Sequence, residues 1–176
     1  AIIFNDTETV AIRPQRNEAN AMTILSHIVR MNHALNVDAT NEPNPEALNN
    51  ALRRTAQMAK HDVLVVIVSD MAGVNTDSER LIAQIAAHND VLTFLTHDHA
   101  RLNALSTALN VSNGTLQTEI DFTNKKIRSH LRSNFEQEQH KLEQYLRRLA
   151  APMLMISNGE ETVTQIRKYF GVPTRK

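Results

Sequence analysis

The sequence predicts an α/β protein with a mostly parallel β-sheet, and three observations predict it. The first is an unbroken apolar run, VLVVIV at residues 63–68, which stops at Ser69-Asp70. Such runs are typical of strands buried on both faces. The second is a helical pattern that leads from this run into another, at residues 90–96. Together they predict a β-α-β unit with parallel strands and a right-handed crossover. The third is the alternation of amphipathic helical patterns with short apolar runs elsewhere in the chain.

Composition excludes several classes of function. The 176 residues predict one domain over residues 1–176. Lys and Arg number 19, as do Asp and Glu, so no net field favours nucleic acid or an anionic membrane. The absence of cysteine excludes thiol chemistry and suits a reducing compartment, so we expect a cytoplasmic location. No apolar stretch is long enough to span a membrane, although tethering through segments outside this chain stays open.

The amino-terminal part predicts a hairpin and two helices. Residues 1–4 are predicted to form a short strand. In residues 9–13 apolar and polar side chains alternate, which predicts a second strand, at an exposed edge, that pairs antiparallel with the first as a hairpin. Residues 17–35 and 44–60 have helical spacing, the latter with Asn44 as N-cap. The chain opens directly on a strand-like run, so we expect an N-terminally truncated domain that lacks its first strand and helix. The side chains expected to face the sheet are Ala21, Met22, Leu25, Ile28, Val29 and Met31 in the first helix, and Leu48, Ala51, Leu52, Thr55 and Met58 in the second.

The remaining elements follow the same alternation, with one insertion. A capping box at residues 76–79 predicts a helix to about residue 88. Asn113-Gly114 between two alternating runs predicts a small inserted β-hairpin. A long amphipathic helix, residues 124–150, precedes a strand at residues 153–156. Asn158 then caps a final helix that ends at Gly171. The side chains expected to face inward on this last helix are Val163, Ile166 and Phe170.

Asp70 is the best candidate for chemistry. In open α/β sheets, ligands bind outside the carboxyl ends of the strands, where Ser69 and Asp70 stand. Oxygen ligands suit a hard divalent cation such as Mg²⁺. One carboxylate binds such an ion poorly, so we expect a hydroxyl partner, for which Thr40 is a candidate and Thr7 or Thr76 could equally be proposed. The alternative is that Asp70 only caps the turn into the next helix.

Other motifs are weaker. His97 and His99 flank Asp98 and could converge on a zinc ion, although a solvated strand-to-loop junction is the favoured interpretation. No P-loop, G-x-G-x-x-G or G-x-S-x-G motif occurs, and the sequence contains four glycines. The sequence therefore offers little material for a phosphate-binding loop.

The order of these elements resembles a von Willebrand factor A domain. More narrowly, the chain is similar to the MoxR-associated family of bacterial and archaeal proteins (domain of unknown function, number fifty-eight). The resemblance covers essentially the whole chain. It rests on AIIF at residues 1–4 with Arg13-Pro14, VVIVSDM at 65–71, HNDVL at 88–92, Asp98 with Leu105, and MIS at 155–157 with Ile166 and Phe170.

This resemblance implies a Rossmann-like three-layer sandwich and a metal-ion-dependent adhesion site. Such a site combines a D-x-S-x-S motif after the first strand, a threonine from a later loop and an aspartate at the end of a central strand. Asp70 matches that aspartate and Thr40 the threonine. No D-x-S-x-S motif occurs in the sequence. We therefore expect Mg²⁺ in the intact domain, and weak binding or none by this chain.

Three functions remain open. The leading hypothesis, which the resemblance implies, is a non-enzymatic protein-interaction module that works with a MoxR-type AAA+ ATPase in the assembly of protein complexes. The alternative is a metal-dependent hydrolase or phosphotransferase, with Asp70 and Asp98 at adjacent strand ends. The third is a structural domain whose exposed sheet edge pairs with a second copy as a homodimer.

Overall fold

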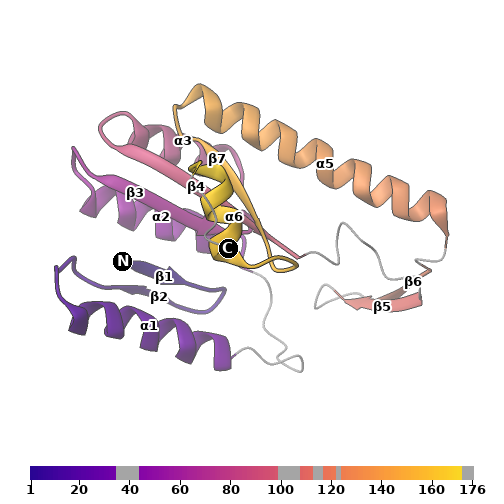
Figure 1. Ribbon diagram of the computed structural model, residues 1–176, viewed down its shortest axis with the longest axis horizontal. Coiled ribbons are helices and arrows are strands. Elements are labelled where there is room, and N and C mark those ends of the chain that lie inside the picture. The colour runs from indigo at the N-terminus through magenta and orange to yellow at the C-terminus, as the bar shows by residue number, and fades with distance from the viewer. Residues whose placement is uncertain (35–43, 99–107, 113–116, 122–123, 172–176) are drawn as a thin grey trace.

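A three-stranded parallel sheet lies at the centre of the protein (Figure 1). The computed structural model describes residues 1–34, 44–98, 108–112, 117–121 and 124–171. Strands β3 (Leu64–Ser69), β4 (Asp90–His97) and β7 (Met153–Ser157) pair in the order β3-β4-β7, and both pairings are parallel. The prediction of a mixed α/β fold with parallel strands is confirmed, and the arrangement is compatible with a Rossmann-like sandwich.

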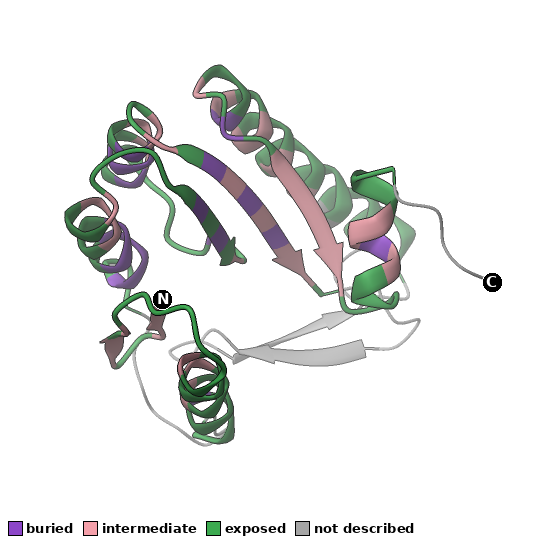
Figure 2. Ribbon diagram, turned by 60° about the vertical axis from the view of Figure 1, so that its left-hand side comes forward, coloured by how far each residue is buried: buried purple, intermediate pink, exposed green. Residues whose placement is uncertain are grey.

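One face of this sheet carries the hydrophobic core. Helices α2 (Ala47–Met58), α3 (Thr76–Ala86) and α5 (Lys125–Arg148) supply apolar side chains that pack against alternate residues of the strands. Figure 2 shows this alternation as purple bands along β3 and β4. The buried core residues are Leu48, Leu52, Val65, Ile67, Met71, Leu81, Ile82, Ile85, Val91, Leu95, Leu146 and Ala151. The predicted inner face of α2 is largely confirmed, except that Met58 is exposed.

The helix starts differ slightly from the prediction. Helix α3 is capped by Asn75, whose side chain accepts hydrogen bonds from the amides of Asp77 and Ser78. The capping box therefore begins at Asn75 and closes on Ser78, one residue earlier than predicted. Helix α2 has Glu46 at its N-cap position, and Asn44 instead accepts a hydrogen bond from the Glu46 amide at 3.0 Å. Asn44 thus organises the turn before the helix.

The amino-terminal hairpin forms a separate small sheet. Strands β1 (Ile2–Phe4) and β2 (Thr9–Ala11) pair antiparallel, as predicted, and pair with no other strand of the described chain. The expected antiparallel edge strand of the main sheet is therefore a two-stranded sheet of its own. Helix α2 contacts both strands of this hairpin and also α3, and so links the hairpin to the core.

Strand β3 is an edge strand with one open face, which corrects the prediction that it is buried on both faces. Val65 and Ile67 are 9% exposed, whereas Leu64, Val66 and Val68 are 63%, 48% and 62% exposed. Side chains alternate between the two faces of a strand, so one face packs in the core with α2 and α3 and the other is largely exposed. An apolar run alone does not distinguish these two situations.

Two helices bury less than their sequence patterns predicted. Helix α1 (Glu18–His33) lies beside the β1–β2 hairpin (Figure 1), and its Met22, Leu25 and Val29 are more than half exposed. Helix α6 (Thr162–Tyr169) exposes Val163 and Phe170, and its buried residue is Gln165. Its N-cap residue is Glu161, so the prediction that Asn158 caps it is wrong. Gly171 follows with a φ of 63°, as expected for a helix end.

The inserted hairpin is confirmed. Strands β5 (Ala108–Ser112) and β6 (Gln117–Asp121) pair antiparallel, with Ser112 opposite Gln117. The predicted turn residues Asn113-Gly114 lie outside the described residues.

Candidate functional site

The carboxyl ends of the three parallel strands meet at one edge of the sheet. Ser69 lies opposite Leu95, and His97 lies opposite Ser157. Each strand is followed by a polar residue: Asp70 after β3, Asp98 after β4 and Asn158 after β7. Parallel pairing thus gathers at one edge residues that are far apart in the sequence.

Asp70 is exposed and holds a tight turn. One of its carboxylate oxygens accepts a hydrogen bond from the Ala72 amide at 3.0 Å. Ser69 Oγ accepts one from the Met71 amide, also at 3.0 Å. Met71 adopts a φ of 57°, a left-handed conformation that these two bonds help to hold. Asp70 therefore does stabilise the turn that follows β3, which was the alternative interpretation of this residue. The hydrogen bond from Ala72 occupies one of its two carboxylate oxygens.

A cleft of about 490 Å³ opens above these strand ends. Asp70 and Asp98 both line it, together with the hydroxyl groups of Thr96, Ser157 and Thr162 and the side chains of His97, Ile156 and Asn158. Asp98 accepts a hydrogen bond from the Asn158 amide group at 3.0 Å. Ser157 Oγ accepts one from the Gly159 amide at 3.1 Å. The imidazole of His97 packs against the ring of Phe135, with 6.1 Å between the centroids.

The donor atoms of this cleft suit a hard cation. Beside the imidazole of His97 and the amide of Asn158, its lining includes two carboxylates and three residues with hydroxyl groups. Oxygen is the ligand that Mg²⁺ prefers, and Mg²⁺ commonly uses one or two carboxylates and keeps several waters. No group of three or more His, Asp or Glu side chains converges within the part of the chain that the structure describes. The cleft fits a weak oxygen site better than a closed structural metal site.

The sequence anticipated this cleft only in part. Asp70 and Ser69 lie at the predicted sheet edge, and Asp98 lines the same cleft as Asp70. Thr40 and His99 lie outside the described residues. Sequence reasoning did not single out Thr96, Ser157 or Thr162, although Thr96 and Ser157 each stand at the polar end of an apolar run, the signal that identified Asp70.

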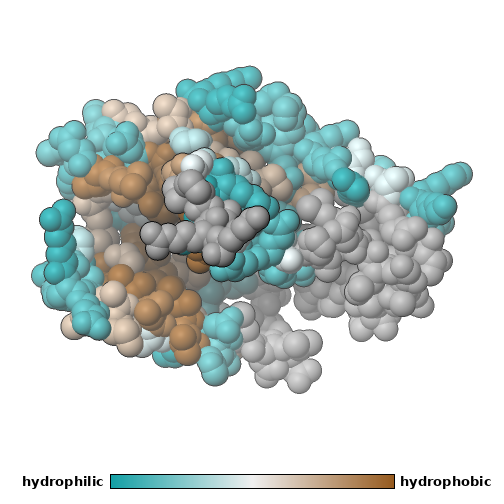
Figure 3. Space-filling view, in the orientation of Figure 1, coloured by the Kyte–Doolittle hydropathy of each residue, from teal (hydrophilic) through white to brown (hydrophobic). Residues whose placement is uncertain are grey.

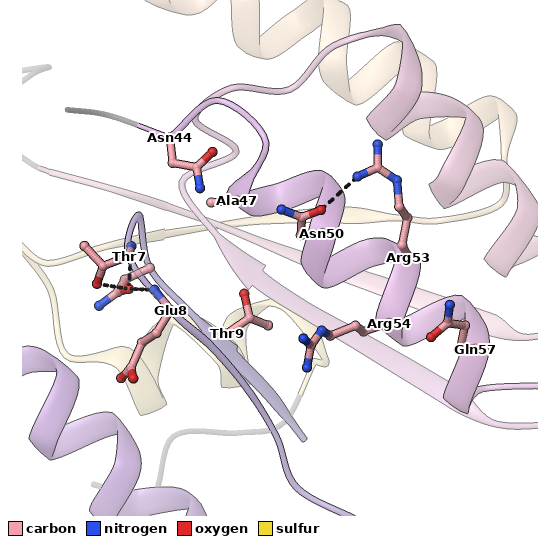
Figure 4. A pocket seen from close by; sticks show the side chains of 10 residues that line it. Thr7, Glu8, Thr9, Asn44, Ala47, Asn50, Arg53, Arg54 and Gln57 are labelled. Atoms are coloured by element: carbon pink, nitrogen blue, oxygen red, sulfur yellow. Dashed lines mark hydrogen bonds between the residues drawn. The ribbon is translucent and has the colours of Figure 1, made fainter. Parts of the chain in front are cut away.

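A second, more polar cavity was not predicted. About 480 Å³ in volume, it lies between the β1–β2 turn and α2 (Figure 4). Arg53 and Arg54 line it from the helix, and Glu8 and Thr9 from the hairpin. Arg53 donates to Asn50 at 2.9 Å and pairs with Glu46 at 3.1 Å. Because a carboxylate already neutralises Arg53, this cavity is a weaker candidate than the strand-end cleft.

Two further histidines lie on the exposed surface of α5. His130 and His140 on α5 form side-chain hydrogen bonds with Asn134 and Gln144, each one helical turn along. None of the described helices is long and apolar enough to cross a membrane.

Comparison of the chain with protein-family models, with curated proteins and with solved structures finds no match.

Proposed function

We propose that this protein is a non-enzymatic interaction module whose strand-end cleft takes a divalent cation and, through it, an acidic group of a partner protein. The observation that carries the proposal is that Asp70 and Asp98, from different strands, line one cleft together with three hydroxyl groups. Mg²⁺ held by these oxygens keeps coordination positions that a partner's carboxylate can fill.

The chemistry of the cleft supports binding rather than turnover. Its side chains are carboxylates, hydroxyls, an amide and one imidazole that packs on Phe135. The hydroxyl of Ser157 is engaged as an acceptor from Gly159. A nucleophile hydrogen-bonded to a general base is the signature of covalent catalysis, and the bonds from Asn158 to Asp98 and from Gly159 to Ser157 do not have that form.

The resemblance to the MoxR-associated family supports a MoxR-type AAA+ ATPase as the partner. Under this proposal the module binds the ATPase only when the cation is present, because the cation bridges two groups that would otherwise repel each other. Size-exclusion chromatography of the chain with a purified MoxR-type ATPase, with Mg²⁺ or with excess chelator, tests it. A complex that persists in chelator contradicts the cation-bridged contact.

The cation site itself is tested by titration of Mg²⁺ into the wild-type chain and two variants. Asp70→Asn removes the charge but keeps an oxygen that can accept from the Ala72 amide, so the turn is preserved. Asp77→Asn removes an exposed carboxylate from the first turn of α3 as the matched control. We expect a dissociation constant of about 10⁻³ M, weakened at least about tenfold by Asp70→Asn alone. Equal affinities for wild type and Asp70→Asn contradict the proposal.

A metal-dependent hydrolase or phosphotransferase is the second candidate, and the shared cleft of Asp70 and Asp98 is the observation that favours it. It predicts turnover of a generic phosphoester such as p-nitrophenyl phosphate with Mg²⁺ or Mn²⁺, abolished by Asp98→Asn. Absence of turnover under conditions where the cation binds favours the interaction module.

A further inference from the structure

An asparagine that is followed by glycine lies beside the strand-end cleft. Asn-Gly occurs twice in the sequence, at residues 113–114 and 158–159. The second pair forms the turn between β7 and α6, and both of its residues are exposed. Figure 3 shows hydrophilic surface where the chain passes from β7 to α6. Asn158 lines the cleft, so a chemical change at this residue alters the cleft directly.

Glycine after an asparagine favours deamidation of the asparagine side chain. In this reaction the backbone nitrogen of the following residue attacks Cγ of the asparagine. Glycine has no Cβ to obstruct the approach, and its backbone adopts conformations that other residues avoid. Asn134 is also exposed, but a bulky residue, Phe135, follows it. Asn158 is therefore the exposed asparagine of the described chain with the least hindered nucleophile.

Water is the only co-reactant that the reaction needs. The Gly159 nitrogen loses its proton and forms a bond to Cγ of Asn158, while the bond from Cγ to Nδ2 breaks. Nδ2 leaves as ammonia with the proton that Gly159 lost, and the chain is left with a cyclic imide. Water then cleaves this imide at Cγ to give aspartate, or at the main-chain carbonyl carbon to give isoaspartate. Both products carry a carboxylate at position 158.

Two hydrogen bonds of the folded chain restrain this reaction. The Gly159 amide, which is the nucleophile, donates to Ser157 Oγ at 3.1 Å. The leaving group, Nδ2 of Asn158, donates to a carboxylate oxygen of Asp98 at 3.0 Å. Both bonds are exposed, so water competes with them and they open more often than buried bonds do. The bonds therefore slow the reaction without preventing it, and Ser157 controls how available the nucleophile is.

The product reverses the interaction between position 158 and Asp98. An aspartate side chain has nearly the shape of asparagine, so a carboxylate oxygen takes the place of Nδ2. The hydrogen bond that links the ends of β4 and β7 is then replaced by two carboxylates that repel each other. A divalent cation between them removes this repulsion. Under the function proposed above, on which this step rests, the cleft then offers three carboxylates instead of two.

We propose that Asn158 is a site of spontaneous deamidation, that the Ser157 hydroxyl limits its rate, and that the product binds a divalent cation in the strand-end cleft more tightly. The affinity of oxygen sites for hard cations depends on the number of charged ligands. Because no enzyme takes part in the reaction, the age of each molecule sets the charge of its cleft.

Mass spectrometry of the tryptic peptide 149–167, in which Asn158 is the one asparagine, tests the modification. The folded chain is incubated in mildly alkaline buffer, and the mass gain of the peptide is followed with time. We expect conversion in the wild type and none in Gly159→Ala over the same period. Ser157→Ala should react up to about tenfold faster than the wild type, because the Gly159 amide loses its acceptor.

Matched controls separate the hydrogen bond from folding. Ser157→Thr keeps the hydroxyl and should react at the wild-type rate. In urea, where the bond to Ser157 is absent, the wild type and Ser157→Ala should react at the same rate. A folded wild-type chain that stays unmodified while the same chain in urea is converted overturns the proposal. So does an equal rate in the folded wild type and in folded Ser157→Ala.

Titration of Mg²⁺ tests the consequence for the cleft. Asn158→Asp supplies the aspartate product in pure form, and Asn134→Asp makes the same change on the exposed surface of α5 as the control. We expect a dissociation constant at least about tenfold lower than that of the wild type for Asn158→Asp, and no change for Asn134→Asp. Equal affinities in wild type and Asn158→Asp, or an equal gain in both variants, overturn this step. The effect of Asp70→Asn on the wild-type affinity tests the proposed function separately, so the two failures are distinguishable.

Discussion

The hydroxyl of Tyr169 bonds both the amide nitrogen and the carbonyl oxygen of Met155, at 3.1 Å each. A side chain of α6 therefore occupies the positions that a neighbouring strand would use on β7. We expect Tyr169→Phe to lower the free energy of unfolding by about 1 kcal/mol, since both bonds are partly exposed to water. Urea denaturation measures this loss. Phe170→Leu, at the exposed next residue, is the control, and an equal loss in both variants contradicts the role given to the hydroxyl.

The two rows of side chains on β3 differ in their contribution to stability. Ile67 packs in the core, whereas Val66 faces outward and is 48% exposed. Ile67→Ala should destabilise the protein by about 2–4 kcal/mol because it leaves a cavity. Val66→Ala should cost less than about 1 kcal/mol. Thermal or urea unfolding of the two variants measures the difference, and similar losses would show that the outer face of β3 is covered.

Thr93 carries a buried hydroxyl that makes no hydrogen bond within the described structure. Valine has nearly the same shape without the polar atom. We expect Thr93→Val to leave the stability unchanged or to raise it by about 1 kcal/mol, because an unsatisfied buried hydroxyl costs free energy. Thr93→Ser, which keeps the hydroxyl and removes a methyl group, should destabilise. Chemical denaturation of both variants checks the order, and a clear loss in Thr93→Val points to a buried partner for the hydroxyl.

Glu46 couples stability to pH. A hydrogen bond from Asn49 lowers the pKa of its carboxyl, and Arg53 adds to the effect. A carboxyl whose pKa is lower in the folded state stabilises the fold above its ordinary value of 4.5 and loses that contribution as the pH falls through the folded pKa. Asn49→Ala should therefore raise the pKa of Glu46.

An NMR titration of the Glu46 side chain measures that change. Asn50→Ala is the control, since the Asn50 side chain accepts from Arg53 and is not among the groups that lower the pKa of the Glu46 carboxyl. A pKa of Glu46 that stays the same in Asn49→Ala would assign the effect to Arg53 instead.

Sequence patterns predicted the order and type of the elements well, because helix caps, turn residues and hydrophobic periodicity act locally. The β-α-β unit and the Asn-Gly hairpin are examples. Burial was predicted less well, since it depends on which element covers which face. Val68 and Leu25 look like core residues in sequence, yet they are 62% and 53% exposed. A buried Gln165 could not be foreseen either, since its partners are backbone groups of another element.

The candidate site could also be predicted only where it depends on local sequence patterns. Asp70 was predictable because the carboxyl end of a buried run is a recurrent ligand position. Asp98 was also expected beside it, because the β-α-β unit predicts adjacent strand ends, whereas Ser157 was not, because only the strand order β3-β4-β7 brings it to the same edge. Strand order depends on long-range pairing and leaves no local signal in the sequence.

Locating a bound cation at Asp70 tests the proposed function of the strand-end cleft. Mn²⁺ can replace Mg²⁺ at oxygen sites and broadens the NMR signals of nuclei near it. We predict that substoichiometric Mn²⁺ broadens the amide signals of Ala72, Asp98 and Asn158 first, that excess Mg²⁺ restores them, and that Asp70→Asn removes the effect. Broadening that is unchanged in Asp70→Asn, or that is centred on other acidic residues, would contradict a cation site in the strand-end cleft.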